Sequence, residues 1–216
     1  MIRSVASDMD DPRQRGAELR EGAVGIIPTD TIYGIVASVH RPDAVERVYE
    51  LKRRERSKPC IVLCSSYDAC TSFPVEWTRD RTRICRGLWP GPVSIVLPCS
   101  MCPDHLTRGA DTLAFRVPND EWLCALLACA GPLIAPSANR EGEEPARKIE
   151  KARTYFGEAV DFYVDNGTLP SKPSTLIDCS KDTFAILRHG AGTAVHDRLC
   201  DILSRDEPNG IEDQSI

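Results

Sequence analysis

The chain has 216 residues, of which 42% are hydrophobic and 27% charged, a composition typical of one globular domain. Its first 16 residues lack the apolar core of a signal peptide, and no apolar run approaches the roughly 20 residues of a membrane span. The formal net charge of −5 argues against non-specific coating of a nucleic acid. These features predict a reduced, cytoplasmic protein rather than a secreted, membrane or fibrous one.

In chain order, apolar runs separated by Pro, Gly and polar turns predict alternating strands and helices. Strands are expected within residues 22–27, 60–64, 93–97, 111–118, 132–136, 161–164, 174–178 and 184–188. Helices are expected at 41–53, 67–70, 76–88, 119–131, 146–156 and 193–204. The pattern indicates a single α/β domain over residues 15–204 with a mixed sheet, and flexible termini at 1–14 and 205–216.

Two polar segments follow predicted elements. Pro28-Thr29-Asp30-Thr31 ends the first strand with two hydroxyls and a carboxylate. It is either a ligand-binding turn at the end of a strand or an Asx turn made by Asp30. The run Lys52-x-Arg54-x-x-x-Lys58 ends the first helix, and five of its seven residues are basic. These cations could neutralise a polyphosphate, or form a solvated helix end paired with Glu50 and Glu55.

Later segments are ambiguous in the same way. Pro136-Ser137-Ala138-Asn139 could contact a phosphate or ribose, or could cap a helix. Ser174 and Arg188 lie beside strands and could be structural. Arg116 lies inside an apolar strand, so its charge needs a carboxylate from the protein or from a ligand.

The ten cysteines suggest no zinc site. Cys99 and Cys102 have ligand spacing, but no second correctly spaced pair follows, and the four histidines show no matching pattern. We therefore expect free thiols and no structural zinc. Neither a P-loop nor a GxGxxG motif occurs.

Seven short motifs occur in a fixed order: PTDTIYG, KxRxxxKP, WPGP, LAFRVP, PSAN, PSTLID and ILRHGA. The set resembles the YrdC/TsaC family, the threonylcarbamoyl-AMP synthases, over residues 15–192. The resemblance implies a twisted mixed α/β sheet flanked by helices, with a concave basic groove (YrdC/RibB-like). It implies a nucleotidyltransferase that converts L-threonine, bicarbonate or CO₂, and ATP into threonylcarbamoyl-AMP and pyrophosphate, the first step of tRNA threonylcarbamoyladenosine modification.

The same resemblance assigns roles to individual residues. Lys52 and Arg54 would be catalytic through the phosphates of ATP, and replacing either should change folding little. The resemblance implies ATP contacts from Arg54, Lys58, Thr112, Ala135, Ser137, Asn139 and Arg188, and threonine contacts from Thr31, Arg116 and Ser174. Arg116 would pair with the threonine carboxylate. Mg²⁺ would accompany ATP, a threonylcarbamoyltransferase complex would use the product, and weak tRNA binding is left open.

Two departures and two alternatives qualify the resemblance. Some members carry a threonine-contacting histidine near Leu63, where this chain is aliphatic, and the chain ends soon after its last helix, as in short members. A basic groove could instead bind double-stranded RNA or tRNA without chemistry, although such a groove needs no Arg116. Carbamoyl transfer in hydrogenase maturation uses a related domain beside zinc-finger and acylphosphatase regions, for which this chain has no room.

Overall fold

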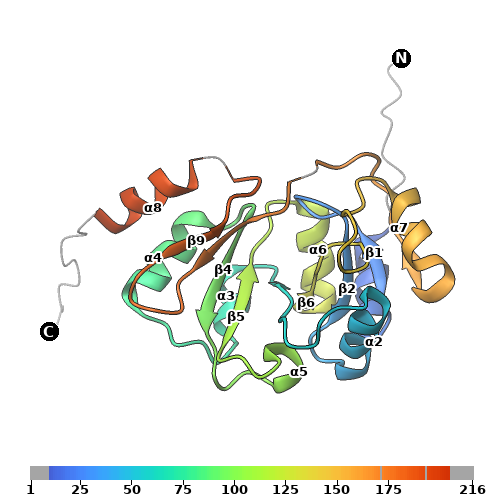
Figure 1. Cartoon of the computed structure of the whole chain (residues 1–216), viewed down its shortest axis with the longest axis horizontal. Helices are drawn as coiled ribbons and strands as arrows, with labels where there is room; N and C mark the ends of the chain where they lie inside the picture. Colours follow the sequence, from blue (N-terminus) through green and yellow to red (C-terminus); the bar gives the residue numbers. More distant parts are fainter. Residues whose placement is uncertain (1–9, 171, 193, 205–216) are drawn as a thin grey trace, which may run out of the picture.

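The structure, a computed structural model, describes residues 10–170, 172–192 and 194–204. Figure 1 shows short strands crossing the middle of the molecule with helices packed around them. The strands are β1 (Gly25–Ile27), β2 (Gly34–Ser38), β3 (Val62–Leu63), β4 (Val93–Pro98), β5 (Thr112–Arg116), β6 (Leu133–Ile134), β7 (Phe162–Tyr163), β8 (Thr175–Asp178) and β9 (Ala185–Arg188). The helices are α1 (Pro12–Arg20), α2 (Pro42–Lys52), α3 (Tyr67–Thr71), α4 (Arg79–Leu88), α5 (Asp104–Thr107), α6 (Glu121–Ala130), α7 (Ile149–Phe156), the 3₁₀ turn η1 (Gly157–Ala159) and α8 (Val195–Ser204).

The strands form one mixed sheet in the order β7-β1-β2-β6-β3-β5-β4-β8-β9. The pairs β1–β7, β3–β5 and β4–β8 are parallel, and the other neighbours are antiparallel. The expected mixed sheet is therefore confirmed. Strands from both halves of the sequence are interleaved, so residues far apart in the chain meet at the ends of neighbouring strands.

Alternate strand residues belong to two separate apolar cores, one on each face of the sheet. Ile26 and Val62 pack in the larger core, which also contains residues of α2, α4, α7 and α8. Ile27 and Leu63 pack in the smaller core with α1 and α6. Leu63 is therefore fully buried in an apolar layer.

Helix ends follow local sequence signals. The Asp120 side chain caps α6 by accepting from the Leu123 backbone N–H at 2.7 Å, and Gly131, at φ 78°, ends the helix. Pro42 occupies the first turn of α2, which ends at Arg53 in a left-handed conformation. Helices α2 and α6, whose ends carry these signals, are both predicted by the sequence.

Two helices were not expected. Helix α1 begins at Pro12 with Asp11 as its N-cap, inside the segment predicted to be a flexible lead-in, and α5 lies between β4 and β5. The rest of the predicted flexible termini, residues 1–9 and 205–216, falls outside the described residues. None of the helices in the described part of the chain has the length and apolar character that a membrane span requires.

The expectation of ten free thiols is wrong at one pair. Cys99 and Cys102 form a disulfide at the end of β4, with their Cα atoms 5.4 Å apart. The remaining cysteines are free, and five of them are buried, including Cys60 and Cys70. The pair that resembled half of a zinc site is thus joined covalently.

Candidate functional site

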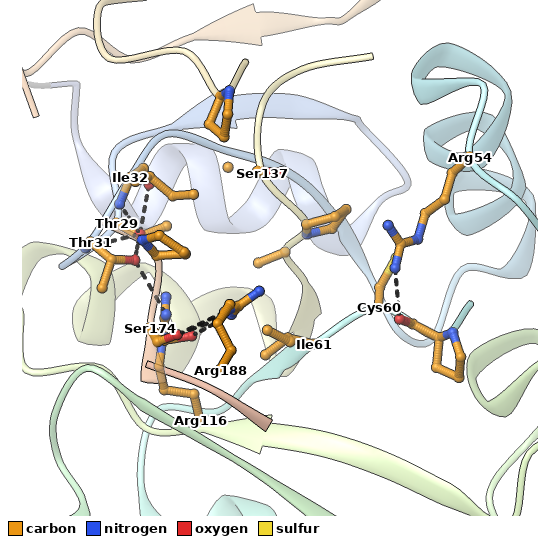
Figure 2. A pocket seen from close by; sticks show the side chains of 16 residues that line it. Thr29, Thr31, Ile32, Arg54, Cys60, Ile61, Arg116, Ser137, Ser174 and Arg188 are labelled. Atoms are coloured by element: carbon orange, nitrogen blue, oxygen red, sulfur yellow. Dashed lines mark hydrogen bonds between the residues drawn. The ribbon is translucent and has the colours of Figure 1, made fainter. Parts of the chain in front are cut away.

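A cavity of about 200 Å³ lies where the β1–β2 turn, the ends of β5 and β9, and the loops before β3, after β6 and before β8 meet. We call it the central cavity. It is lined by Thr29, Thr31, Ile32, Gly34, Arg54, Pro59, Cys60, Ile61, Arg116, Ala135, Pro136, Ser137, Pro145, Pro173, Ser174 and Arg188. Figure 2 shows Thr31, Arg116 and Ser174 together on one side of this cavity and Arg54 on the opposite side.

Thr29 organises the β1–β2 turn. Its Oγ1 donates to the Ile32 carbonyl at 2.7 Å and accepts from the backbone N–H groups of Thr31 and Ile32 at 3.2 Å. The Thr29 and Thr31 hydroxyls lie 3.1 Å apart, and both are buried. The turn is therefore held by a threonine rather than by Asp30, so the Asx-turn alternative is wrong.

Arg116 ends β5 with its guanidinium inside the protein. Its side chain is 5% exposed, and Nη2 lies 3.2 Å from Oδ1 of Asp30, whose side chain is 7% exposed. Nη1 donates to the Thr31 hydroxyl at 3.3 Å. Burial lowers the pKa of Arg116, the Asp30 charge opposes this shift, and the Arg188 charge adds to it. Of the two sources of a carboxylate that the sequence left open for Arg116, the protein itself therefore supplies one.

The hairpin of β8 and β9 brings Ser174 and Arg188 to the same side. Arg188 donates from Nε and Nη2 to the Ser174 carbonyl at 3.1 and 3.0 Å. The Ser174 hydroxyl lies 2.8 Å from the Ser94 hydroxyl and is buried, whereas Arg188 is exposed at the mouth of the cavity. Together with Thr31, Ser174 offers this end of the cavity two hydroxyl groups.

Arg54 approaches from the loop after α2. Its Nε and Nη2 donate to the carbonyls of Lys58 and Pro59, each at 3.1 Å, which fixes the guanidinium against the loop. Lys58 lies outside the cavity lining and pairs with Glu55 at 2.6 Å and Glu141 at 2.9 Å. Of the two glutamates named in the helix-end alternative, Glu55 pairs with Lys58, whereas Glu50 lies 3.7 Å from Arg56.

Lys52 is buried rather than presented to a ligand. It is 2% exposed, and its Nζ donates to the carbonyls of Ser137 at 2.5 Å and Asn139 at 2.6 Å. Desolvation, together with the neighbouring Arg54 charge, lowers the pKa of Lys52 to about 8. The ammonium thus anchors residues 136–139 to the end of α2, so in contrast to the sequence-based prediction we now expect its replacement to disturb this loop.

The anchored loop is not a helix cap. The Ser137 hydroxyl donates to Oδ1 of Asn139 at 2.5 Å, and Asn139 donates from Nδ2 to the carbonyls of Arg140 and Glu143 at 2.8 Å. Helix α7 begins only at Ile149. Ser137 lines the central cavity and Asn139 supports it from behind.

The structure brings seven predicted site residues into the lining of the central cavity: Thr31, Arg54, Arg116, Ala135, Ser137, Ser174 and Arg188. Lys52, Lys58, Thr112 and Asn139 are outside it, and Thr112 pairs with Pro98 at the end of β5 opposite to Arg116. The sequence reasoning missed the contributions of Thr29, Asp30 and Ile61. Thr29 and Asp30 belong to a motif that was recognised. Thr29 acts within its own turn, whereas the role of Asp30 depends on Arg116 in a strand far away in the sequence.

The lining carries three arginines and no carboxylate, an environment suited to an anionic ligand. Within the described residues, no group of three or more His, Cys, Asp or Glu side chains is placed to hold a metal ion. Mg²⁺ prefers carboxylate and phosphate oxygens. The lining therefore does not fit a protein-held magnesium ion.

Comparisons with known proteins identify the family of the chain. The family model Sua5_yciO_yrdC, described as "Telomere recombination", matches residues 17–190. A "Threonylcarbamoyl-AMP synthase" of Bacillus subtilis is 33% identical over 192 residues, covering 85% of this chain and 55% of that protein. A protein of the same name from Thiobacillus denitrificans is 34% identical over 174 residues, covering 80% of this chain and 92% of that protein.

Among solved structures, Sua5 of P. abyssi complexed with L-threonine matches with a TM-score of 0.78 and 30% sequence identity. The match covers 83% of this chain and 54% of that one. The chain thus spans about half the length of the B. subtilis and P. abyssi proteins and nearly all of the T. denitrificans one.

Proposed function

The chain belongs to the Sua5–YciO–YrdC family, and on this premise we propose that it is an L-threonylcarbamoyladenylate synthase, a nucleotidyltransferase. The observation that carries the proposal is the composition of the central cavity. Three arginines and four hydroxyl-bearing residues, Thr29, Thr31, Ser137 and Ser174, line one small space. Such a set suits a carboxylate together with a polyphosphate.

The proposed reaction needs positioning more than acid–base chemistry. The threonine amine adds to CO₂ and loses a proton, which gives a carbamate. A carbamate oxygen then attacks the α-phosphorus of ATP, and the bond to the β-phosphate oxygen breaks to release pyrophosphate. Fixed cations that neutralise charge on the phosphates stabilise the transition state of such a transfer.

We assign threonine to the end of the cavity formed by Thr31, Arg116 and Ser174. A volume of about 200 Å³ suits an amino acid better than a whole nucleotide, because ligand pockets for larger molecules measure roughly 300–1,000 Å³. ATP would therefore extend outward past Arg54 and Arg188, with Ala135 and Ser137 beside it. Lys52 and Asn139 would shape this surface without touching the nucleotide.

Other components are proposed on chemical grounds. A magnesium ion would be held by the phosphates of ATP, since the lining provides no carboxylate. A separate threonylcarbamoyltransferase complex would carry the product to tRNA, which would place the enzyme in the cytoplasm with its substrates. Lys58 is exposed in the same loop as Arg54, so it would be available to ATP outside the cavity. Thr112 lies at the end of β5 opposite to Arg116, and we assign it no ligand contact.

The test is to incubate the protein with ATP, labelled threonine and bicarbonate, and to follow threonylcarbamoyl-AMP and pyrophosphate together. The Arg116→Lys variant keeps the charge but loses the two-pronged donor, so it should need about ten- to a hundredfold more threonine for the same rate. Arg47→Lys is the matched control, because Arg47 pairs with Asp161 away from the cavity. Absence of threonine-dependent pyrophosphate in the wild-type protein would contradict the proposal.

A further inference from the structure

Asp30 stands immediately behind the cavity lining, against the arginine assigned to threonine. We infer that Asp30 is a resident counter-ion of Arg116, which stabilises the guanidinium while the site is empty and competes with the substrate carboxylate when it is filled. This inference rests on the proposed function, because the competing carboxylate is that of threonine. It makes Asp30 a positioning residue that sets the affinity for the amino acid.

The contact between the two groups is incomplete. A bidentate arginine–carboxylate pair has two bonds of about 2.7–2.9 Å, whereas here one Nη2–Oδ1 contact measures 3.2 Å. Nε of Arg116 is buried and has no hydrogen-bond partner among the described residues. Oδ1 of Asp30 also accepts no hydrogen bond there, so its contact with Nη2 is an ion pair only. Arg116 therefore keeps donor capacity for a second carboxylate.

Asp30 is itself held in place from the other side. Its Oδ2 accepts from the backbone N–H of Asn119 at 3.3 Å, in the segment that follows β5. The carboxylate is thus tied to the same chain segment that carries Arg116. It is placed to remain beside the guanidinium when a ligand arrives, rather than to swing away.

The charges predict opposite effects on stability and affinity. An unpaired buried guanidinium is costly, so Asp30 stabilises the empty protein. A substrate carboxylate on Arg116 would lie close to the Asp30 carboxylate in a poorly solvated site, and like charges at that range repel. Removing the Asp30 charge should therefore weaken the empty protein and strengthen carboxylate binding.

A purely structural role predicts a different result. If Asp30 only maintained the fold of the turn, its loss would disturb Thr31 and Arg116 together. Every ligand would then bind less tightly, whether or not it carries a carboxylate. The sign of the affinity change distinguishes the two roles.

The experiment compares Asp30→Asn with the wild-type protein, using L-threonine and L-threoninamide, which lacks the carboxylate charge. We expect the Tm of the empty variant to fall by at least about 5 °C. The Kd for threonine should decrease about three- to thirtyfold, while that for threoninamide should stay unchanged. Asp161→Asn is the matched control, since it removes the carboxylate paired with Arg47 away from the cavity, and its threonine affinity should equal that of wild type.

Two further measurements cover a variant that does not fold and a wild-type protein that does not bind threonine. If Asp30→Asn does not fold alone, threonine added during refolding should rescue it and threoninamide should not. Weaker threonine binding by the variant, or failure of rescue, overturns the inference. A wild-type protein that binds no threonine contradicts the proposed function instead. The inference is then tested with acetate, a carboxylate without the rest of the substrate. Acetate should stabilise Asp30→Asn more than wild type at equal ionic strength, and equal stabilisation of the two proteins would overturn the inference.

Discussion

Lys52 and Lys58 come from one short basic motif but have different surroundings. The Lys52 ammonium is enclosed and donates to two backbone carbonyls, whereas Lys58 is exposed and forms two ion pairs with glutamates. Exposed ion pairs contribute little to stability, because water and salt screen them. A buried ammonium that satisfies two carbonyls holds a loop in place.

We expect Lys52→Met to lower the free energy of unfolding by about 2 kcal/mol. Each buried carbonyl that loses its donor costs about 1–3 kcal/mol, and relief from burying the charge offsets part of this loss. Urea denaturation near neutral pH measures the change. Lys58→Met is the control and should alter stability by less than about 0.5 kcal/mol.

The pH dependence of the stability difference between wild type and Lys52→Met tests whether the ammonium is buried. Lys52 has a pKa of about 8 in the folded protein and 10.5 as its ordinary value, so between these values the unfolded chain binds the extra proton. Stability from this group therefore rises with pH through that interval, by at most about 1.4 kcal/mol per pH unit. The difference between wild type and Lys52→Met should widen from pH ~8 to ~10. A constant difference would show that the ammonium is not buried.

Arg54 is the cation of the motif that reaches the cavity. We expect Arg54→Ala to reduce turnover at least about a hundredfold, which is roughly 3 kcal/mol of transition-state stabilisation. Stability should change little, because Arg54 is only half-buried and its acceptors lie in a loop. Arg56→Ala is the control, since exposed Arg56 pairs with Glu46 outside the cavity. Equal loss of turnover in both variants would contradict a specific role for Arg54.

At the scale of elements, the hairpin of β8 and β9 depends on a close backbone approach at Gly190. A Cβ placed there would lie 2.2 Å from the Pro173 carbonyl oxygen and 2.3 Å from the Ser174 carbonyl carbon. The Gly190 N–H also donates to the Thr175 hydroxyl at 3.0 Å. The turn after β9 therefore fixes the backbone of Ser174 at the cavity.

Gly190→Ala should displace Ser174 by forcing these backbones apart. We expect threonine affinity to fall at least about tenfold, since small displacements of a positioning group are costly, and the Tm to fall as well. Calorimetric titration with threonine measures the affinity. His189→Ala, at the exposed neighbouring position, should bind like wild type. A folded Gly190→Ala protein with wild-type affinity would exclude this role of the turn.

Local signals account for the elements that the sequence predicts correctly and for those it misses. Helix α6 lies between an Asp cap and a Gly stop, both visible in sequence. Helix α1 has the same kind of start, Asp11 followed by Pro12, but its polar surface hides it. It buries few residues, and Gly16 allows it to approach α6 closely.

The sequence did not predict which residues contact one another across the sheet. The motifs identified most of the cavity lining, because they lie in or at the ends of predicted strands or, for Arg54, just after a predicted helix. The Arg116–Asp30 pair joins residues 86 positions apart, and the burial of Lys52 depends on a loop 85 positions away. Strand order decides such contacts, and periodicity within one segment carries no information about it.

At the scale of the whole molecule, the central cavity is a junction between the two ends of the sheet. Thr31 comes from the β1–β2 turn, whereas Ser174 and Arg188 come from the β8–β9 hairpin at the other end of the strand order. Figure 1 shows this hairpin and α8 on the side of the molecule opposite to β1, α2 and α7. A ligand that touches both sets of residues would link the two ends.

We therefore expect threonine and ATP to stabilise the fold and to do so unevenly. A ligand at a hundred times its Kd adds about 2.7 kcal/mol to the free energy of unfolding, which for a chain of this size raises the Tm by about 5–10 °C. Hydrogen exchange should slow most in β8, β9 and the β1–β2 turn, because the ligand restrains the ends that it links. Helix α1, which packs on α6 away from the cavity, serves as the internal reference. D-threonine, with the same charges and the opposite hand, should give neither effect. Protection spread evenly over the chain, or equal stabilisation by D-threonine, would show that the cavity does not join the two ends of the sheet through its ligand.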